Sequence, residues 1–414
     1  MKFEYGCIGE TLKHSFSKEI HEKLADYSYG LMEIPKDSLD AFMTLRNFKA
    51  INVTIPYKEA VIPYLYEIDS HAKEIGAVNT VVNRDGRLYG YNTDFYGLKA
   101  LIDHLGITVI GRKVAILGTG GTSKTACAVA KSLGASSIIR VSRRDSDDTV
   151  SYSALYEQHS DAEIIINTTP VGMYPNIDES PLDLSHFKGL VGLVDAVYNP
   201  IRTTLVSEAM KLGIAAEGGL YMLVSQAVRA SEIFLGVTYP ADSADKIYSS
   251  LLRKKENIVL VGMPSSGKST VGAILADKLG RVLTDTDSLI VDNERKSIPE
   301  IFSLHGEMYF RDAEETAVRS ASSLTGAVIA TGGGAVLRAA NVDSLKKNGR
   351  IYFIDRPCDK LIATSDRPLS KDIESIRKLY DSRYNIYLRS ADKVIIADST
   401  PEEVAERILE DFCK

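Results

Sequence analysis

Short apolar runs alternate with amphipathic segments along most of the chain. The alternating segments have helical periodicity, whereas the runs are short and rich in Val and Ile. The runs stand at 114–118, 137–142, 163–167, 192–198, 257–262, 327–334, 350–355 and 393–398. Buried strands that alternate with helices predict an α/β architecture with parallel sheets.

The first 97 residues have a different pattern. Residues 81–92 read VVNRDGRLYGYN, with Asp85-Gly86 between two strand-like runs. An Asp-Gly pair between such runs is typical of a tight hairpin turn. We therefore expect an antiparallel pair within a mixed sheet in this part of the chain.

The length of the chain predicts more than one domain. Its 414 residues exceed the usual domain size, which is about 100–200 residues. The charged segment LLRKKEN (251–257) stands just before a new buried strand and is the expected joint. Hydrophobic residues make up 44% and charged residues 25%, as in an ordinary soluble globular protein.

Charge and composition limit the classes of partner and the cellular location that we expect. The net charge of −6 argues against a nucleic-acid partner. No apolar run is long enough for a membrane span, and the start MKFEYGCIGE carries acids where a signal peptide needs an apolar stretch. The four cysteines are scattered and the histidines form no metal-binding motif. We therefore expect a cytoplasmic protein with reduced thiols and no metal held by protein ligands alone.

Residues 262–269, GMPSSGKS, match the phosphate-binding pattern GxxxxGK[ST]. The match follows the apolar run IVLV and precedes the helical segment TVGAILADKLG. Glycines allow the backbone N–H groups to turn toward phosphate oxygens, Lys268 supplies a mobile positive charge, and Ser269 is a candidate Mg²⁺ ligand. The motif predicts a nucleoside triphosphate as ligand.

Acidic and basic residues after this loop point to a small anionic acceptor. RVLTDTDSLI (281–290) brings Asp285 and Asp287 to the same side of the chain. One carboxylate suits Mg²⁺, and the other suits a substrate hydroxyl. Separate arginines suit an anionic substrate and the triphosphate charge; they are Arg311, Arg367 and Arg383.

Residues 256–414 resemble the shikimate kinase family on these motifs and on ATGGGAV, DRPL and DSRYNIY. The resemblance implies a P-loop fold of the nucleoside-monophosphate-kinase type, with Lys268 and Asp287 as catalytic residues. The shikimate-binding residues that it implies are Asp287, Arg311, Gly332, Gly333, Gly334 and Arg383. The ATP-binding residues that it implies are Gly262, Ser265, Ser266, Gly267, Lys268, Ser269, Thr270 and, from the lid, Arg367. Mg²⁺ would be held by Ser269 and Asp285.

The lid segment DKLIATSDRPLS (359–370) departs from that family. Family members usually have a longer lid with a further arginine that covers the adenine, and Ile362 or Ala363 stands in its place here. We expect an active kinase that binds nucleotides more weakly and less selectively, unless a neighbouring residue covers the base.

A second phosphate-binding loop, GTGGTS (118–123), is a variant of GxGxxG. It lies between VAIL and the helical segment KTACAVAKSLG, so a pyrophosphate would meet a helix N-terminus. At the end of the next strand an acid would hold the ribose of NAD. The chain has Ser142, Arg143 and Arg144 there, which favour the 2′-phosphate of NADP, although Asp145 keeps NAD open.

A lysine and a carboxylate are the candidate acid–base pair for this half. INVTIPYKEA (51–60) predicts Lys58 in the first turn of a helix opened by Pro56, and YGYNTDFYG (89–97) places Asp94 just after a strand. Reduction of a ketone needs a proton for the developing alkoxide, which such a pair can supply. A buried structural ion pair is the alternative.

Residues 1–250 resemble the shikimate dehydrogenase family on LKHSFS, NVTIPYK, GAVNT, YNTD, GTGGTS, NTTPVGM, DAVYNP and GGLYMLVSQA. The resemblance implies that Lys58 and Asp94 are the catalytic pair. The substrate-binding residues that it implies are Ser15, Ser17, Thr54, Lys58, Asn79, Asp94, Tyr198 and Gln226. The NADP-binding residues that it implies are Gly118, Gly120, Gly121, Ser142, Arg143, Arg144, Thr168, Gly219 and Met222. Family members usually have Ser-Pro where this chain has Ser17-Lys18.

The two resemblances together predict a bifunctional enzyme. NADPH-dependent reduction of 3-dehydroshikimate would be followed by ATP-dependent phosphorylation of shikimate, with only small-molecule substrates and a possible homodimer. The expected domains are 1–97 with 220–250 for substrate, 98–219 as a Rossmann domain, and 256–414 as the P-loop domain. Two alternatives stay open: a quinate and NAD enzyme with a weakened or regulatory kinase domain, and a scaffold of degenerate domains.

Overall fold

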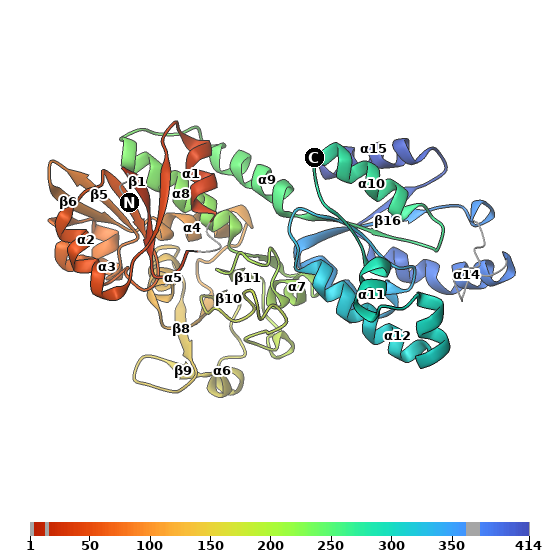
Figure 1. The fold of residues 1–414 in the computed structure, drawn as a ribbon. Helices are drawn as coiled ribbons and strands as arrows, with labels where there is room; N and C mark the ends of the chain where they lie inside the picture. Colours follow the sequence, from red (N-terminus) through yellow and green to blue (C-terminus); the bar gives the residue numbers. More distant parts are fainter. Residues whose placement is uncertain (1–3, 13–15, 362–372, 414) are drawn as a thin grey trace. The chain divides into compact units, whose positions relative to one another are not determined.

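The chain folds into two compact units, Met1–Ser249 and Ser250–Lys414 (Figure 1). The computed structural model describes residues 4–12, 16–361 and 373–413. The boundary between the units falls inside helix α9 (Ser243–Lys255). None of the described helices combines the length and the apolar character needed to cross a membrane.

The first sheet of the N-terminal unit has six strands in the order β2-β1-β3-β5-β6-β4. The strands are β1 (Tyr5–Gly9), β2 (Tyr29–Glu33), β3 (Ala50–Val53), β4 (Glu67–Ile68), β5 (Thr80–Arg84) and β6 (Arg87–Tyr91). Strand β1 pairs in parallel with β2 and β3, whereas β5 is antiparallel to β3 and β6. The predicted hairpin and mixed sheet are confirmed: Asp85 and Gly86 connect β5 to β6 with φ values of 52° and 82°.

Helices cover both faces of this mixed sheet. They are α1 (Ser17–Leu24), α2 (Leu39–Leu45), α3 (Ser70–Ile75) and α8 (Leu220–Leu235). Helix α4 (Asp94–His104) packs instead into the core of the parallel sheet described next. Residues of α2 and α3 pack on one face, and the C-terminal half of α8 packs on the other through Ala230 and Phe234. Helices α4 and α8 cross closely at Gly97, where an added Cβ would lie 2.5 Å from the carbonyl oxygen of Met222.

The second sheet has six parallel strands in the order β12-β11-β10-β7-β8-β9. The strands are β7 (Lys113–Leu117), β8 (Ser137–Ser142), β9 (Val150–Ser151), β10 (Ile164–Asn167), β11 (Gly192–Asp195) and β12 (Ala215–Glu217). The helices are α5 (Gly121–Ser132), α6 (Tyr152–Gln158) and α7 (Thr204–Lys211). Both faces are buried, and the order reverses between β7 and β10, where Rossmann folds bind dinucleotides.

The C-terminal unit contains a parallel five-stranded sheet in the order β14-β15-β13-β16-β17. The strands are β13 (Asn257–Val261), β14 (Leu283–Asp285), β15 (Val328–Ala330), β16 (Gly349–Asp355) and β17 (Lys393–Ile396). The helices are α10 (Lys268–Leu279), α11 (Thr286–Glu294), α12 (Ile298–Ser322), α13 (Ala339–Asn348), α14 (Ile373–Ser390) and α15 (Pro401–Phe412). Helices α10 and α15 cover one face of the sheet, and α12, α13 and α14 cover the other (Figure 1). The predicted fold class is therefore confirmed for both units.

One predicted element is wrong. No α-helix begins at Pro56; residues 55–61 form consecutive turns that lead into the short 3₁₀ segment Ile62–Tyr64. Pro63 explains why the turns do not continue as an α-helix, because it has no N–H group to donate to the carbonyl four residues earlier. Lys58 therefore lies on a turn and not in the first turn of a helix.

Candidate active sites

Lys58 and Asp94 form an ion pair in the N-terminal unit. Lys58 Nζ lies 2.6 Å from Asp94 Oδ2, and the two side chains are 16% and 11% exposed. Lys58 comes from the turns after β3, whereas Asp94 is the first residue of α4. The pair is close enough for a hydrogen bond and retains access to solvent, as an acid–base pair requires.

A polar network lies beside this pair. Asn79 Oδ1 accepts hydrogen bonds from the Thr93 backbone N–H at 2.7 Å and from Thr93 Oγ1 at 3.2 Å. Thr93 Oγ1 is also 3.3 Å from Gln226 Oε1, so α8 joins the network. The Val78 N–H donates to the Lys58 carbonyl at 2.8 Å, which holds Lys58 next to Asn79. The structure thus brings Lys58, Asn79, Asp94 and Gln226 together.

The rest of the predicted substrate site consists of Ser15, Ser17, Thr54 and Tyr198. Thr54 follows β3 at the start of the turns that carry Lys58. Ser17 opens α1, and the ring of its neighbour Phe16 packs at 5.4 Å from that of Tyr198. Burial raises the pKa of Tyr198, so its hydroxyl stays a neutral hydrogen-bond donor. Ser15 lies outside the described residues.

The glycine loop after β7 forms an open helix N-terminus. Gly118 has φ of +106°, and an added Cβ would lie 2.8 Å from Thr168 Oγ1, so Gly118 and Thr168 meet where the strand order reverses. A Cβ at Gly120, the residue before α5, would meet nothing within 4 Å; at Gly121 its nearest neighbour would be Lys58 Cδ at 3.7 Å. The loop therefore fits a pyrophosphate and lies beside the Lys58 side chain.

Two arginines stand at the end of β8. Arg143 and Arg144 are exposed, and no carboxylate of the described residues lies within 4.0 Å of either. Ser142 Oγ accepts the Arg144 N–H at 3.1 Å. Asp145 Oδ1 accepts the Ser151 N–H at 2.6 Å, so one of its oxygens serves the backbone. The edge offers positive charge, which suits a ribose 2′-phosphate.

Gly219 and Met222 lie at the start of α8. Gly219 precedes this helix, and a Cβ there would lie 2.3 Å from the carbonyl oxygen of Ala196, just past β11. Met222 is buried against the helices that cover the parallel sheet. Both residues are therefore held at the carboxyl end of β11, the edge of the sheet on which Gly118 and Thr168 lie.

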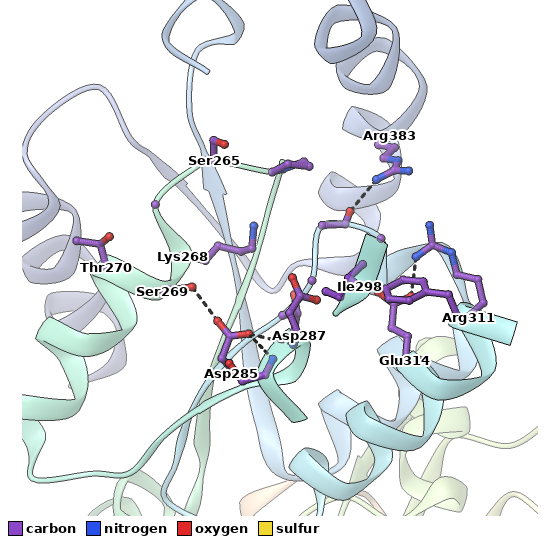
Figure 2. A pocket seen from close by; sticks show the side chains of 18 of the residues that line it. Ser265, Lys268, Ser269, Thr270, Asp285, Asp287, Ile298, Arg311, Glu314 and Arg383 are labelled. Atoms are coloured by element: carbon purple, nitrogen blue, oxygen red, sulfur yellow. Dashed lines mark hydrogen bonds and ion pairs between the residues drawn. The ribbon is translucent and has the colours of Figure 1, made fainter. Parts of the chain in front are cut away.

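The second site is a cavity of about 580 Å³ in the C-terminal unit (Figure 2). The phosphate-binding loop bends at Ser265 and Gly267, with φ of 63° and 96°. Lys268 Nζ donates to the carbonyls of Gly262 and Met263, each at 2.9 Å, and the side chain is almost buried. The backbone of the loop and Lys268 together fit the phosphate chain of a nucleotide.

Ser269 and Asp285 supply adjacent oxygen ligands. Ser269 Oγ donates to Asp285 Oδ2 at 2.8 Å, and Asp285 Oδ1 caps α11 by accepting the N–H groups of Asp287 and Ser288 (Figure 2). Hydroxyl and carboxylate oxygens are the ligands that Mg²⁺ prefers. The pair therefore fits the metal site that the sequence predicts.

Close backbone approaches build the other end of this cavity. A Cβ at Gly332 would lie 2.4 Å from Asp287 Oδ1, and one at Gly334 would lie 2.0 Å from Arg311 Nη1. Arg383 Nη1 donates to the Gly333 carbonyl at 3.1 Å. The glycine segment thus brings Asp287, Arg311 and Arg383 around one space, as Figure 2 shows.

Sequence reasoning missed several residues of the two sites. Glu314, on α12, is 1% exposed and accepts a hydrogen bond from Arg311 Nη1 at 2.7 Å. Burial raises the pKa of Glu314, while the charge of Arg311 opposes the rise. The sequence RDAE (311–314) indicated this pair, because residues three positions apart are neighbours on a helix. Thr93 could have been found from its place next to Asp94 in YNTD. Nothing in the sequence pointed to Arg356, which also lines the cavity. Arg367 and the lid segment from residue 362 lie outside the described residues.

Comparison with known families identifies both ends of the chain. Residues 7–81 match the shikimate dehydrogenase substrate binding domain, and residues 264–413 match shikimate kinase. Shikimate dehydrogenase (NADP(+)) of Clostridium beijerinckii is 37% identical over 246 residues, which cover 56% of this chain and 91% of that protein.

Solved structures give the same similarity for the N-terminal unit. Shikimate dehydrogenase 1 of Peptoclostridium difficile has a TM-score of 0.55 and 37% identity, covering 61% of this chain and 98% of that one. Shikimate 5-dehydrogenase of Thermus thermophilus, solved in complex with NADP(H) and shikimate, has a TM-score of 0.54 and 27% identity, covering 59% and 98%.

Proposed function

Because the chain belongs to the shikimate dehydrogenase family and continues into a shikimate kinase domain, we propose that it catalyses two consecutive reactions. The first is the reduction of 3-dehydroshikimate to shikimate with NADPH, and the second is the phosphorylation of shikimate to shikimate 3-phosphate with ATP. The chain is an enzyme of both kinds, and its cofactors are NADP(H), ATP and Mg²⁺. The direction of the first reaction is supported by chemistry, since its product is the acceptor of the second.

A single observation carries the dehydrogenase half of the proposal. The Lys58–Asp94 pair, at 2.6 Å, lies beside a glycine loop whose Gly121 faces Lys58 Cδ. NADPH, when bound, supplies a hydride to the substrate carbonyl. Lys58 Nζ would then donate a proton to the developing alkoxide, and Asp94 would hold the ammonium group in position. Asn79 and Gln226 would orient the ring hydroxyls, and Ser17 the carboxylate.

The kinase half rests on the cavity in the C-terminal unit. Lys268 and the backbone of its loop would bind the phosphates, while Arg311 and Arg383 would bind the carboxylate of shikimate. Asp287 would accept the proton of the attacking hydroxyl. Ser269 and Asp285 would hold Mg²⁺, which would supply positive charge to offset that of the phosphate oxygens.

Two point variants of the full chain test the assignment of each reaction to its unit. Lys58→Ala should strongly lower shikimate-dependent reduction of NADP⁺ and leave ADP release from ATP and shikimate intact. Lys268→Ala should do the reverse. If either variant removed both activities, or neither, the assignment would be wrong. Faster turnover of quinate with NAD⁺ in the same assay would replace the proposed substrate and cofactor.

A further inference from the structure

The strand order of the C-terminal sheet sets the direction in which a nucleotide extends. All strands are parallel, so the segments after them meet at one edge. The phosphate-binding loop follows the central strand β13, while Asp287 follows β14 and the glycine segment 332–334 follows β15, both on one side of β13. The γ-phosphate must reach that side. The remainder of the nucleotide must then lie toward β16 and β17.

Arg356 stands on that other side. It follows β16, which pairs with β13 along its length, up to Val261 opposite Phe353. A Cβ at Gly262 would lie 2.7 Å from the carbonyl oxygen of Ile354, so the loop and the end of β16 are in contact. Arg356 lines the same cavity as Ser265, Lys268 and Thr270.

The guanidinium group of Arg356 is oriented and still has donors to offer. Arg356 Nε donates to the Lys360 carbonyl at 3.1 Å, and Lys360 Nζ donates to the Asp398 carbonyl at 3.1 Å, just past β17. No carboxylate of the described residues lies within 4.0 Å of Arg356. The N–H groups of both Nη atoms therefore lack a described acceptor, and paired guanidinium donors match phosphate oxygens.

Besides Lys268, the other cations named in this cavity already have partners on the acceptor side. Arg311 pairs with Glu314 and Glu307, and Arg383 donates to the Gly333 carbonyl on the acceptor side. We propose that Arg356 binds the phosphate chain of the nucleotide from the β16 side of the loop and so sets the affinity of the kinase for nucleotides. This inference rests on the proposed kinase function and adds a residue to its nucleotide site.

Calorimetric titration of the full chain with Mg²⁺ and either ADP or inorganic tripolyphosphate tests the proposal without turnover. Loss of charged hydrogen bonds in Arg356→Ala should weaken binding of both probes about 10- to 100-fold. Arg356→Lys, which keeps the charge but not the fork of donors, should fall between this variant and wild type. Arg389→Ala removes an equal charge from an exposed position on α14 outside the cavity and should bind as wild type.

The other possible results distinguish failure of this inference from failure of the proposed kinase function. Unchanged binding of both probes by Arg356→Ala would overturn the inference while leaving the kinase function standing. Weaker ADP binding with unchanged tripolyphosphate binding would place Arg356 at the base or ribose and overturn the phosphate assignment. Retained shikimate affinity in Arg356→Ala shows that the variant is folded. If wild type bound neither probe, the proposed function and this inference would both fail.

Discussion

The two phosphate-binding loops of this chain follow similar buried strands yet place positive charge very differently. After β7 the loop has no cation of its own, and Arg143 and Arg144 stand exposed at the end of the neighbouring strand β8. After β13 the loop carries Lys268, which is almost buried in a cavity of about 580 Å³. A pyrophosphate that stays intact needs only backbone donors, whereas a phosphoryl group that is transferred needs charge close to the reacting atoms.

The two sites also differ in how they bring catalytic groups together. In the N-terminal unit, side chains from separate elements meet directly, as Lys58 and Asp94 do at 2.6 Å. In the C-terminal unit, a glycine segment allows Asp287 and Arg311 to approach the backbone itself. The first site should therefore be most sensitive to loss of a side chain, and the second to addition of one.

The largest expected effect is on the first site. Lys58→Ala should lower the turnover of the dehydrogenase about 10²- to 10⁴-fold, the usual contribution of a positioned acid–base group. Steady-state assays with shikimate and NADP⁺ measure it. Lys99→Ala is the matched control, because Lys99 is an exposed lysine on α4 that pairs with Asp103. A loss smaller than about threefold would remove Lys58 from the mechanism.

Gly332→Ala tests the second site by adding one methyl group. Its Cβ would lie 2.4 Å from Asp287 Oδ1, so the carboxylate must move. Displacement of a catalytic group by about 1 Å can cost about 10²-fold in rate, and we expect a loss of that size in kinase turnover. The dehydrogenase of the same protein serves as internal control. Unchanged kinase turnover would show that the close approach of Asp287 to Gly332 is not required.

Replacing Arg143 and Arg144 together by Ala tests the exposed charge beside the first loop. The KM for NADPH should rise about 10- to 100-fold, because charged hydrogen bonds to the 2′-phosphate are lost. The KM for NADH should hardly change, since NADH lacks that phosphate. Equal shifts for both nucleotides would mean that the arginines act on the fold and not on the cofactor.

The smallest effect is expected at the crossing of α4 and α8, which holds Asp94 and Gln226 in the first site. Gly97→Ala would place a Cβ 2.5 Å from the Met222 carbonyl oxygen and should destabilise the N-terminal unit by about 1–3 kcal/mol. Urea unfolding measures the change. Gly189→Ala, whose added Cβ meets nothing within 4 Å, is the control. Equal stability of the two variants would contradict the tight crossing.

Much of the fold could be predicted from local sequence patterns. The prediction failed where a single proline interrupted such a pattern. The alternation of apolar runs and helical segments predicted parallel sheets, and Asp85-Gly86 predicted the hairpin, because these signals act within a few residues. The helix predicted at Pro56 failed because Pro63 interrupts the pattern only seven residues later. The roles of the predicted site residues stay predictions that the variants above address.

The sequence by itself determined the type of chemistry, since each loop carries its glycines and Lys268 within one short segment. Only the tertiary structure decided which distant side chains meet. Asp94 forms a hydrogen bond with Lys58, which is distant in the sequence, and Gln226 contacts the same network through Thr93. Glu314 pairs with Arg311 beside Asp287. Arg356 belongs to the kinase cavity only because β16 lies next to β13 in the sheet. Local patterns do not encode such contacts, because strand order and helix crossings are set by packing of the whole core.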